Sequence, residues 1–270
     1  MEKLLHTPEG VRDIYNVECG KKLALENRLK KTLHLFGYHD IQTPTFEYFD
    51  VFRKEIGTIP SKDLYKFFDK EGNTLVLRPD ITPSIARVAA TLFGEEDLPI
   101  RLCYTGNTFI NHSNNQGRLR EVTQMGAELI GDDSEAAAAE MLAMVIDSLK
   151  AAGLKEFQVE LGQVAFYRSL LEDTGVCGEG EEELNQLGEN KKDFGVAELL
   201  KGQDIDEGLK QAVLKLPELF GSLEQIAQAR KLTSAPRALA AIERLEQVHA
   251  ILKSYGLADY VSFDLGMLSK

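Results

Sequence analysis

The sequence has few cysteines, no long apolar run and no grouping of metal-binding residues. Its three cysteines lie far apart and are odd in number, so no disulfide framework is indicated and a reduced, cytoplasmic environment is expected. They form no CxxC pair, and the five histidines show no ligand spacing, so the sequence predicts no metal site. No stretch approaches the roughly 18 apolar residues of a membrane span, so no association with a membrane is expected.

Basic residues are also in deficit. The chain has 31 Lys and Arg against 43 Asp and Glu, which gives a formal net charge of −12. Because binding of nucleic acids depends on neutralising phosphates, a chain this acidic is not expected to bind tRNA. At 270 residues, with 43% hydrophobic residues, the chain has the composition of a globular protein with one large domain or a domain with an insertion.

The most informative stretch is residues 101–131, which predicts two extended arms joined by a polar turn. Ser, Asn, Gln and Gly make up the turn at residues 113–117 and favour a chain reversal. Two cations, an amide and a carboxylate on one face suit a small zwitterionic ligand, although a solvated sheet face explains the same pattern. In the second arm the two-residue period of a strand predicts that these four lie on one side of a sheet: Arg118, Arg120, Gln124 and Glu128.

Apolar periodicity and chain breakers predict the remaining elements. Thr82 is the expected N-cap of a helix that ends near Phe93, because Pro83 suits the first helical position. The Gly- and Glu-rich segment 175–192 is interpreted as a solvated turn and helix start. The other predictions are helices over 18–36, 133–152 and 164–172, strands within 38–47, 157–162 and 260–268, a hairpin over 57–76, and a helical region over 193–255.

Four short motifs, and the order in which they follow one another along the chain, resemble the histidyl branch of the class II aminoacyl-tRNA synthetases. The resemblance implies an α+β fold, in which a mixed, mainly antiparallel sheet is flanked by helices and carries a helical insertion. It implies a synthetase-like core over 1–175, a helical insertion over 176–255 and a strand over 256–270 that returns to the core sheet, with family chains continuing beyond. The motifs are HTPEGVRD at 6–13, LRPDITP at 77–83, QGRLR at 116–120 and QMGAE at 124–128.

The same resemblance implies a histidine-binding site. Asp80, Thr82 and Gln124 would hold the α-amino end of histidine, and Glu128 would accept a hydrogen bond from the imidazole. An ammonium and an imidazole N–H both require anionic or carbonyl acceptors, so these residue types fit that ligand. Asp80 is one methylene shorter than the Glu that the family has at this position.

Position 110 departs from the family pattern. Family members have an arginine there that holds the α-phosphate of ATP, and this chain has Ile110. Losing a group that stabilises the developing charge costs about 10²–10³ in rate, so we expect a chain that does not form an adenylate and needs no cofactor. Arg118 and Arg120 remain as candidate anion-binding residues.

The sequence also resembles a family of histidyl-tRNA synthetase paralogues, the regulatory subunits of ATP phosphoribosyltransferase. Three runs carry this resemblance: TGNTF at 105–109, LRPDITP at 77–83 and FDLGM at 263–267. It implies a non-catalytic protein of histidine biosynthesis that activates a short-form catalytic subunit and takes part in feedback inhibition by histidine. The segment with Pro44 and Glu47 resembles motif 1 of the class II enzymes, which implies a homodimer.

Two other hypotheses fit the same residues. One is a fragment or divergent form of histidyl-tRNA synthetase, which activates histidine with ATP. The other is a further class II paralogue with a different amino-acid ligand, for which Glu128 is the discriminating residue, because an apolar or cationic ligand side chain needs a different partner.

Overall fold

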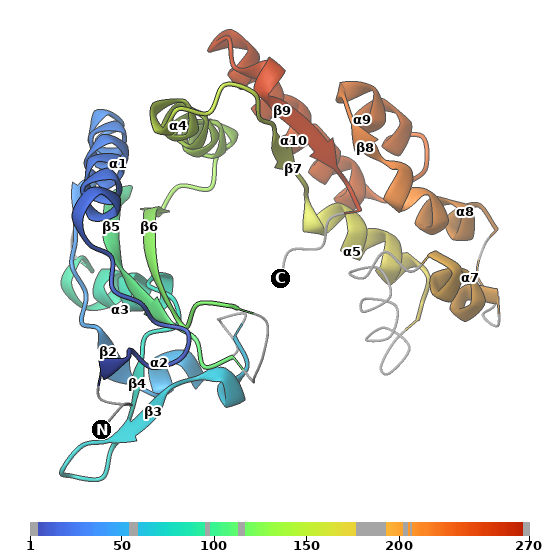
Figure 1. The fold of residues 1–270 in the computed structure, drawn as a ribbon. Helices are drawn as coiled ribbons and strands as arrows, with labels where there is room; N and C mark the ends of the chain where they lie inside the picture. Colours follow the sequence, from blue (N-terminus) through green and yellow to red (C-terminus); the bar gives the residue numbers. More distant parts are fainter. Residues whose placement is uncertain are drawn as a thin grey trace. The chain divides into compact units, whose positions relative to one another are not determined.

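The chain forms two compact units of mixed helices and strands (Figure 1). Met1–Asp133 and Asp147–Gly153 form the first unit, and Ser134–Ile146 and Leu154–Lys270 form the second. The predicted domain boundaries at 175 and 255 divide the chain differently and remain a prediction. The computed structural model describes residues 5–53, 59–94, 98–112, 117–176, 193–201, 205 and 207–266.

The first unit contains two small sheets. In one, β1 (His39–Asp40) runs parallel to β5 (Ile100–Phe109), and β5 pairs antiparallel with β6 (Glu121–Ile130). The other is antiparallel with the order β2-β4-β3. Its strands are β2 (Phe46–Tyr48), β4 (Thr74–Leu77) and β3 (Lys66–Phe68), and the helices of this unit are α1 (Asn16–Leu35), α2 (Asp50–Arg53) and α3 (Thr82–Leu92), with a 3₁₀ turn over Ser61–Asp63.

Helix α3 covers one face of the β5–β6 hairpin. Ile81 and Ile85, at the start of this helix, form a buried cluster with Ile100, Leu102 and Tyr104 of β5. The period of two along a strand places Tyr104 on the same face as Gly126, its partner in register on β6. The helix and this face of the hairpin therefore form the hydrophobic core beneath the predicted site.

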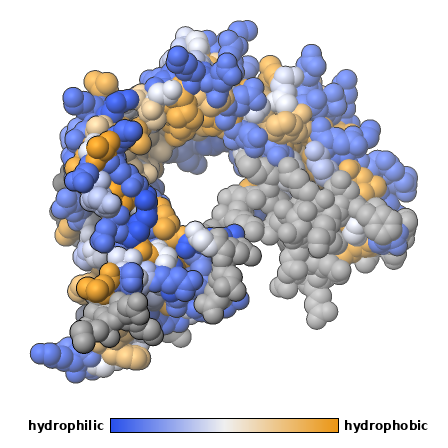
Figure 2. Space-filling model, in the orientation of Figure 1, coloured by the Kyte–Doolittle hydropathy of each residue, from blue (hydrophilic) through white to orange (hydrophobic). Residues whose placement is uncertain are grey.

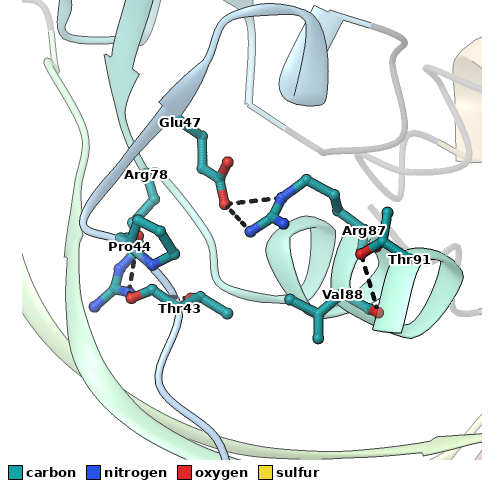
Figure 3. A network of polar contacts seen from close by, with 7 residues as sticks. All are labelled: Thr43, Pro44, Glu47, Arg78, Arg87, Val88 and Thr91. Atoms are coloured by element: carbon teal, nitrogen blue, oxygen red, sulfur yellow. Dashed lines mark hydrogen bonds and ion pairs between the residues drawn. The ribbon is translucent and has the colours of Figure 1, made fainter. Parts of the chain in front are cut away.

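A buried polar network joins β2 to the loop before α3 and to α3 itself (Figure 3). Arg78 is only 6% exposed and donates to the carbonyls of Thr43 and Asn107, each at 2.8 Å. Arg87 of α3 donates to the buried Glu47 at 2.7 Å. Burial lowers the pKa of Arg78, and the charge of Glu47 opposes this shift. The network fixes the loop that carries Asp80.

The second unit is mainly helical. Helices α5 (Val164–Asp173) and α10 (Pro236–Ser254) pack against each other. Their side chains Phe166, Leu170 and Ile242 are fully buried in the core of this unit. Its sheet has the order β7-β9-β8, with β9 parallel to β7 and antiparallel to β8. The elements are α5 (Val164–Asp173), α7 (Asp193–Lys201), α8 (Glu207–Lys215), α9 (Leu223–Ala229), α10 (Pro236–Ser254), β7 (Val159–Leu161), β8 (Phe220–Gly221) and β9 (Val261–Asp264), with 3₁₀ turns over Leu216–Glu218 and Ala258–Tyr260; α4 (Glu135–Ala152) is shared between the units.

Most predicted elements form close to their predicted positions. The hairpin arms appear as β5 and β6, and the last strand appears as β9, whose partners are β7 and β8. The short strand β8 interrupts the region that was predicted to be helical. The Gly- and Glu-rich segment and the hairpin turn lie largely outside the described residues. No helix in the described part of the chain is long and apolar enough to cross a membrane.

Two local predictions were wrong. Thr82 does not cap α3: the N-cap position is Ile81, and Asp80 Oδ1 accepts hydrogen bonds from the amides of Ile81 (2.7 Å) and Thr82 (3.4 Å). The Thr82 hydroxyl bonds instead to a carboxylate on β6. The second wrong prediction placed Arg118 and Arg120 on the same strand face as Gln124 and Glu128. Both arginines precede β6, which begins only at Glu121.

Candidate functional site

The polar cluster is our name for Asp80, Thr82, Gln124 and Glu128, which the fold brings together in the first unit. Asp80 lies in the loop between β4 and α3, and Thr82 is the first residue of α3. Gln124 and Glu128 lie four residues apart on β6, so both face α3. All four residues that the sequence predicted for histidine binding therefore meet between one loop, one helix start and one strand.

Two hydrogen bonds link α3 and its preceding loop to β6. Gln124 Nε2 donates to Asp80 Oδ1 at 3.1 Å, and Thr82 Oγ1 donates to Glu128 Oε1 at 2.7 Å. The two contacts join Asp80 and Thr82 of the LRPDITP motif to Gln124 and Glu128 of the QMGAE motif, across 44 and 46 positions of the chain. A solvated sheet face does not require such pairs, so the geometry favours an organised site.

Gln124 has an acceptor atom without a partner among the described residues. Because a carboxylate accepts hydrogen bonds, the amide nitrogen must face Asp80, and this fixes the orientation of the Gln124 side chain. Its Oε1 is then buried without a hydrogen bond. A buried acceptor left unpaired costs about 1–3 kcal/mol, so this atom is suited to receive a donor from a ligand or a water molecule.

Tyr104 belongs to the site, although sequence reasoning assigned it no role. Its side chain is buried, and its hydroxyl donates to Glu128 Oε1 at 3.4 Å. Burial raises the pKa of Tyr104 to about 12, and the charges of Glu128 and Asp80 also raise it. Tyr104 therefore remains a neutral donor at ordinary pH. The signal in the sequence was Gly126: a side chain there would collide with the Tyr104 ring across the strand pair.

Arg78 is a second residue that sequence reasoning missed, although it lies in the LRPDITP motif. Its guanidinium also donates to the Pro44 carbonyl at 3.2 Å (Figure 3). Together with the bond to the Asn107 carbonyl, this contact holds both β5 and the segment before β2 against the loop that carries Asp80. A Cβ atom at Gly106 would collide with this guanidinium. Arg78 therefore anchors the loop that leads to Asp80, through hydrogen bonds to the backbone of Thr43, Pro44 and Asn107.

The other end of the hairpin is arranged differently. Ile110 donates its amide to the Arg120 carbonyl at 3.0 Å, and the Arg120 amide donates to the Gly10 carbonyl at 2.6 Å. Gly10 has a φ of +80°, and a Cβ atom there would lie 2.6 Å from Arg120 Cγ. Arg118 is exposed. Among the described residues, neither arginine shares a hydrogen bond with the polar cluster, so the predicted anion site is separate from it.

Comparison with known proteins places the chain in a family. The model of the histidyl-tRNA synthetase family matches residues 10–270. The chain belongs to this family. A structure from Bacillus halodurans, described as an ATP phosphoribosyltransferase regulatory subunit/histidyl-tRNA synthetase, matches with a TM-score of 0.90 and 33% identity, over 98% of this chain and 69% of that one. The α+β, class II synthetase-like fold expected for the family is confirmed.

Two curated relatives of this chain carry the same name. A protein of Ruminiclostridium cellulolyticum named ATP phosphoribosyltransferase regulatory subunit is 45% identical over 264 residues, which is 98% of this chain and 63% of the relative. One of Thermoanaerobacter pseudethanolicus with the same name is 37% identical over 98% of this chain and 69% of the relative. The chain thus spans about two thirds of the length of these proteins.

Proposed function

We propose that this chain acts as a regulatory subunit of ATP phosphoribosyltransferase in histidine biosynthesis. The observation that carries the proposal is the similarity, at 37–45% identity over 98% of the chain, to proteins that bear this name. The protein would stimulate a short-form catalytic subunit and deliver feedback inhibition by histidine. It would act in the cytoplasm.

Histidine is the proposed ligand of the polar cluster. The α-ammonium group would donate to Asp80 and to the unpaired Oε1 of Gln124, and the imidazole N–H would donate to Glu128. Thr82 and Tyr104 already hold Glu128 Oε1, which orients the carboxylate. Hydrogen bonds to charged groups contribute about 1.5–3 kcal/mol each, so three of them support binding at micromolar concentrations.

The proposed protein is not itself an enzyme. Adenylation of an amino acid requires a fixed cation at the α-phosphate of ATP, and Ile110 supplies none at the end of β5. Arg120 is packed beneath Gly10, whereas Arg118 is exposed, so Arg118 is the more accessible candidate for binding an anion. Binding of histidine without its activation suits a sensor, because binding and catalysis require different groups.

A homodimer through the segment that resembles motif 1 is part of the proposal. In the first unit, Phe46 and Tyr48 of β2 are 52% and 58% exposed, and Phe67 of β3, which shares their face of the sheet and whose ring contacts that of Phe46, is 37% exposed. Apolar side chains reach the surface of this region, at the lower left of Figure 2. An apolar sheet face of this kind fits an interface with a second copy.

The acidic composition of the chain argues against binding of tRNA.

The test is the activity of a short-form ATP phosphoribosyltransferase catalytic subunit, measured with and without this protein and then with added histidine. Stimulation that histidine reverses is the expected result. The Bacillus halodurans protein is also described as a histidyl-tRNA synthetase, so the second candidate function is activation of histidine with ATP. Absence of stimulation together with histidine-dependent ATP–pyrophosphate exchange would replace our proposal by that one.

A further inference from the structure

A second cluster of chemically reactive side chains lies behind the polar cluster, on the opposite face of β5. His34 comes from the last turn of α1, Asp40 from β1 and Cys103 from β5. Because successive residues of a strand face opposite sides, Cys103 lies on the side away from its neighbour Tyr104. The function proposed above uses none of these three residues.

Their donor atoms lie close together. His34 Nε2 lies 3.1 Å from Asp40 Oδ2, and Cys103 Sγ lies 3.7 Å from Asp40 Oδ1. All three donor atoms lie within 4.8 Å of one another. Tetrahedral coordination with bonds of roughly 2.0–2.3 Å places neighbouring donor atoms about 3.3–3.8 Å apart, so small side-chain movements would complete the geometry.

We propose that His34, Asp40 and Cys103 bind one Zn²⁺ ion. A nitrogen, an oxygen and a sulfur donor together suit a borderline cation better than Mg²⁺ or Ca²⁺, which prefer oxygen donors alone. Three protein ligands leave a fourth position for water. Cys103 is 1% exposed, whereas the His34 and Asp40 side chains are 44% and 46% exposed, so an ion can enter from solvent and reach the buried sulfur.

Binding would exchange one cation for another. Lys30, one turn before His34 on α1, lies 2.9 Å from Asp40 Oδ2 and would move away when the metal binds. Burial raises the pKa of Cys103 to about 11, so the thiol carries its proton in the absence of metal. Zn²⁺ replaces that proton on the sulfur, the proton passes to solvent, and no change of oxidation state is needed.

The ion would join three segments that are distant in sequence. It would fasten the end of α1 to β1 and to β5, the strand that carries Tyr104 on its other face. Since the metal binds only the folded arrangement of these segments, it should raise the thermal unfolding midpoint of the protein. This proposal is independent of the function proposed above.

The site is tested by titrating the metal-free, reduced protein with Zn²⁺ alone and measuring the binding by calorimetry. A second titration uses Co²⁺ in place of Zn²⁺ and records the absorption spectrum. One ion per chain and a thiolate-to-cobalt charge-transfer band are the expected results. His34→Gln should weaken binding at least about tenfold, whereas His39→Gln, an exposed histidine on the adjacent strand, should not. Lys30→Met should strengthen binding, because it removes the competing cation.

Cysteine variants complete the test. Cys103→Ser should abolish the cobalt charge-transfer band, and the matched change Cys19→Ser should leave it intact. If Cys103→Ser does not fold, the exposed position His34 still decides the question. Absence of the band in the unmodified protein, equal weakening by His34→Gln and His39→Gln, or weaker binding after Lys30→Met would overturn the proposal.

Discussion

The two ends of the β5–β6 hairpin differ in what they retain. At one end, Gln124 and Glu128 form hydrogen bonds with Asp80 and Thr82, and the buried Oε1 of Gln124 has no hydrogen bond. At the other end, the apolar Ile110 follows β5, and Arg120 is packed beneath Gly10. Under the proposed function, the contrast means that recognition of an amino acid and stabilisation of a phosphate would reside in separate groups of one hairpin, so that one could be kept without the other.

The largest expected effect comes from Arg78, whose buried guanidinium holds the loop that carries Asp80. Arg78→Met should lower the free energy of unfolding by about 3–5 kcal/mol, because it leaves several buried carbonyls without their charged donor. Urea denaturation measures this change. The matched control is Arg12→Met, whose salt bridge with Glu18 is exposed and should contribute less than about 1 kcal/mol. Equal losses in the two variants would show that the Arg78 network is not stabilising.

The polar cluster itself is tested by Glu128→Ala. Histidine affinity, measured by calorimetry, should fall roughly 10–150-fold, which corresponds to about 1.5–3 kcal/mol for a hydrogen bond to a charged group. Glu121→Ala changes the same residue type on the opposite face of β6 and should leave the affinity unchanged. An unchanged affinity in Glu128→Ala would mean that the imidazole contact is assigned to the wrong residue.

Tyr104 links the site to stability at high pH. Its pKa is raised to about 12 in the folded protein from an ordinary value of 10, so the folded state holds the proton more tightly than the unfolded state. The stability from this group is complete below pH 10 and should be lost between pH 10 and pH 12, at most about 3 kcal/mol. Tyr104→Phe should show a shallower decline in unfolding free energy over that range, and parallel curves would contradict the assignment.

The smallest expected effect tests whether the two ends are independent. Ile110→Arg should leave histidine affinity within about twofold, because position 110 lies beyond the end of β5 and shares no hydrogen bond with the polar cluster among the described residues. The same variant should bind ATP more tightly, which equilibrium dialysis measures. A large loss of histidine affinity would show that the ends are coupled.

Much of the local structure was predictable from the pattern of residues. The arms of the hairpin over 101–131, the helix predicted over 133–152 and the hairpin predicted over 57–76 follow from residue periodicity and from chain breakers, and Gly72 and Gly153 have the positive φ that glycine tolerates. Thr82 was misjudged because composition cannot tell whether a hydroxyl bonds to its own helix or to a distant carboxylate. Tyr104 and Arg78 were missed because their roles depend on packing against Gly126 and Gly106.

The sequence by itself determined which polar groups make up the candidate site and that position 110 carries no cation, since both can be read from residue types within short motifs. Only the tertiary structure decided which groups meet. The pairing of Asp80 with Gln124, and the gathering of His34, Asp40 and Cys103, join positions that no local spacing relates. The reason is physical: side-chain chemistry is encoded locally, whereas strand register and helix packing bring donor and acceptor atoms within bonding distance.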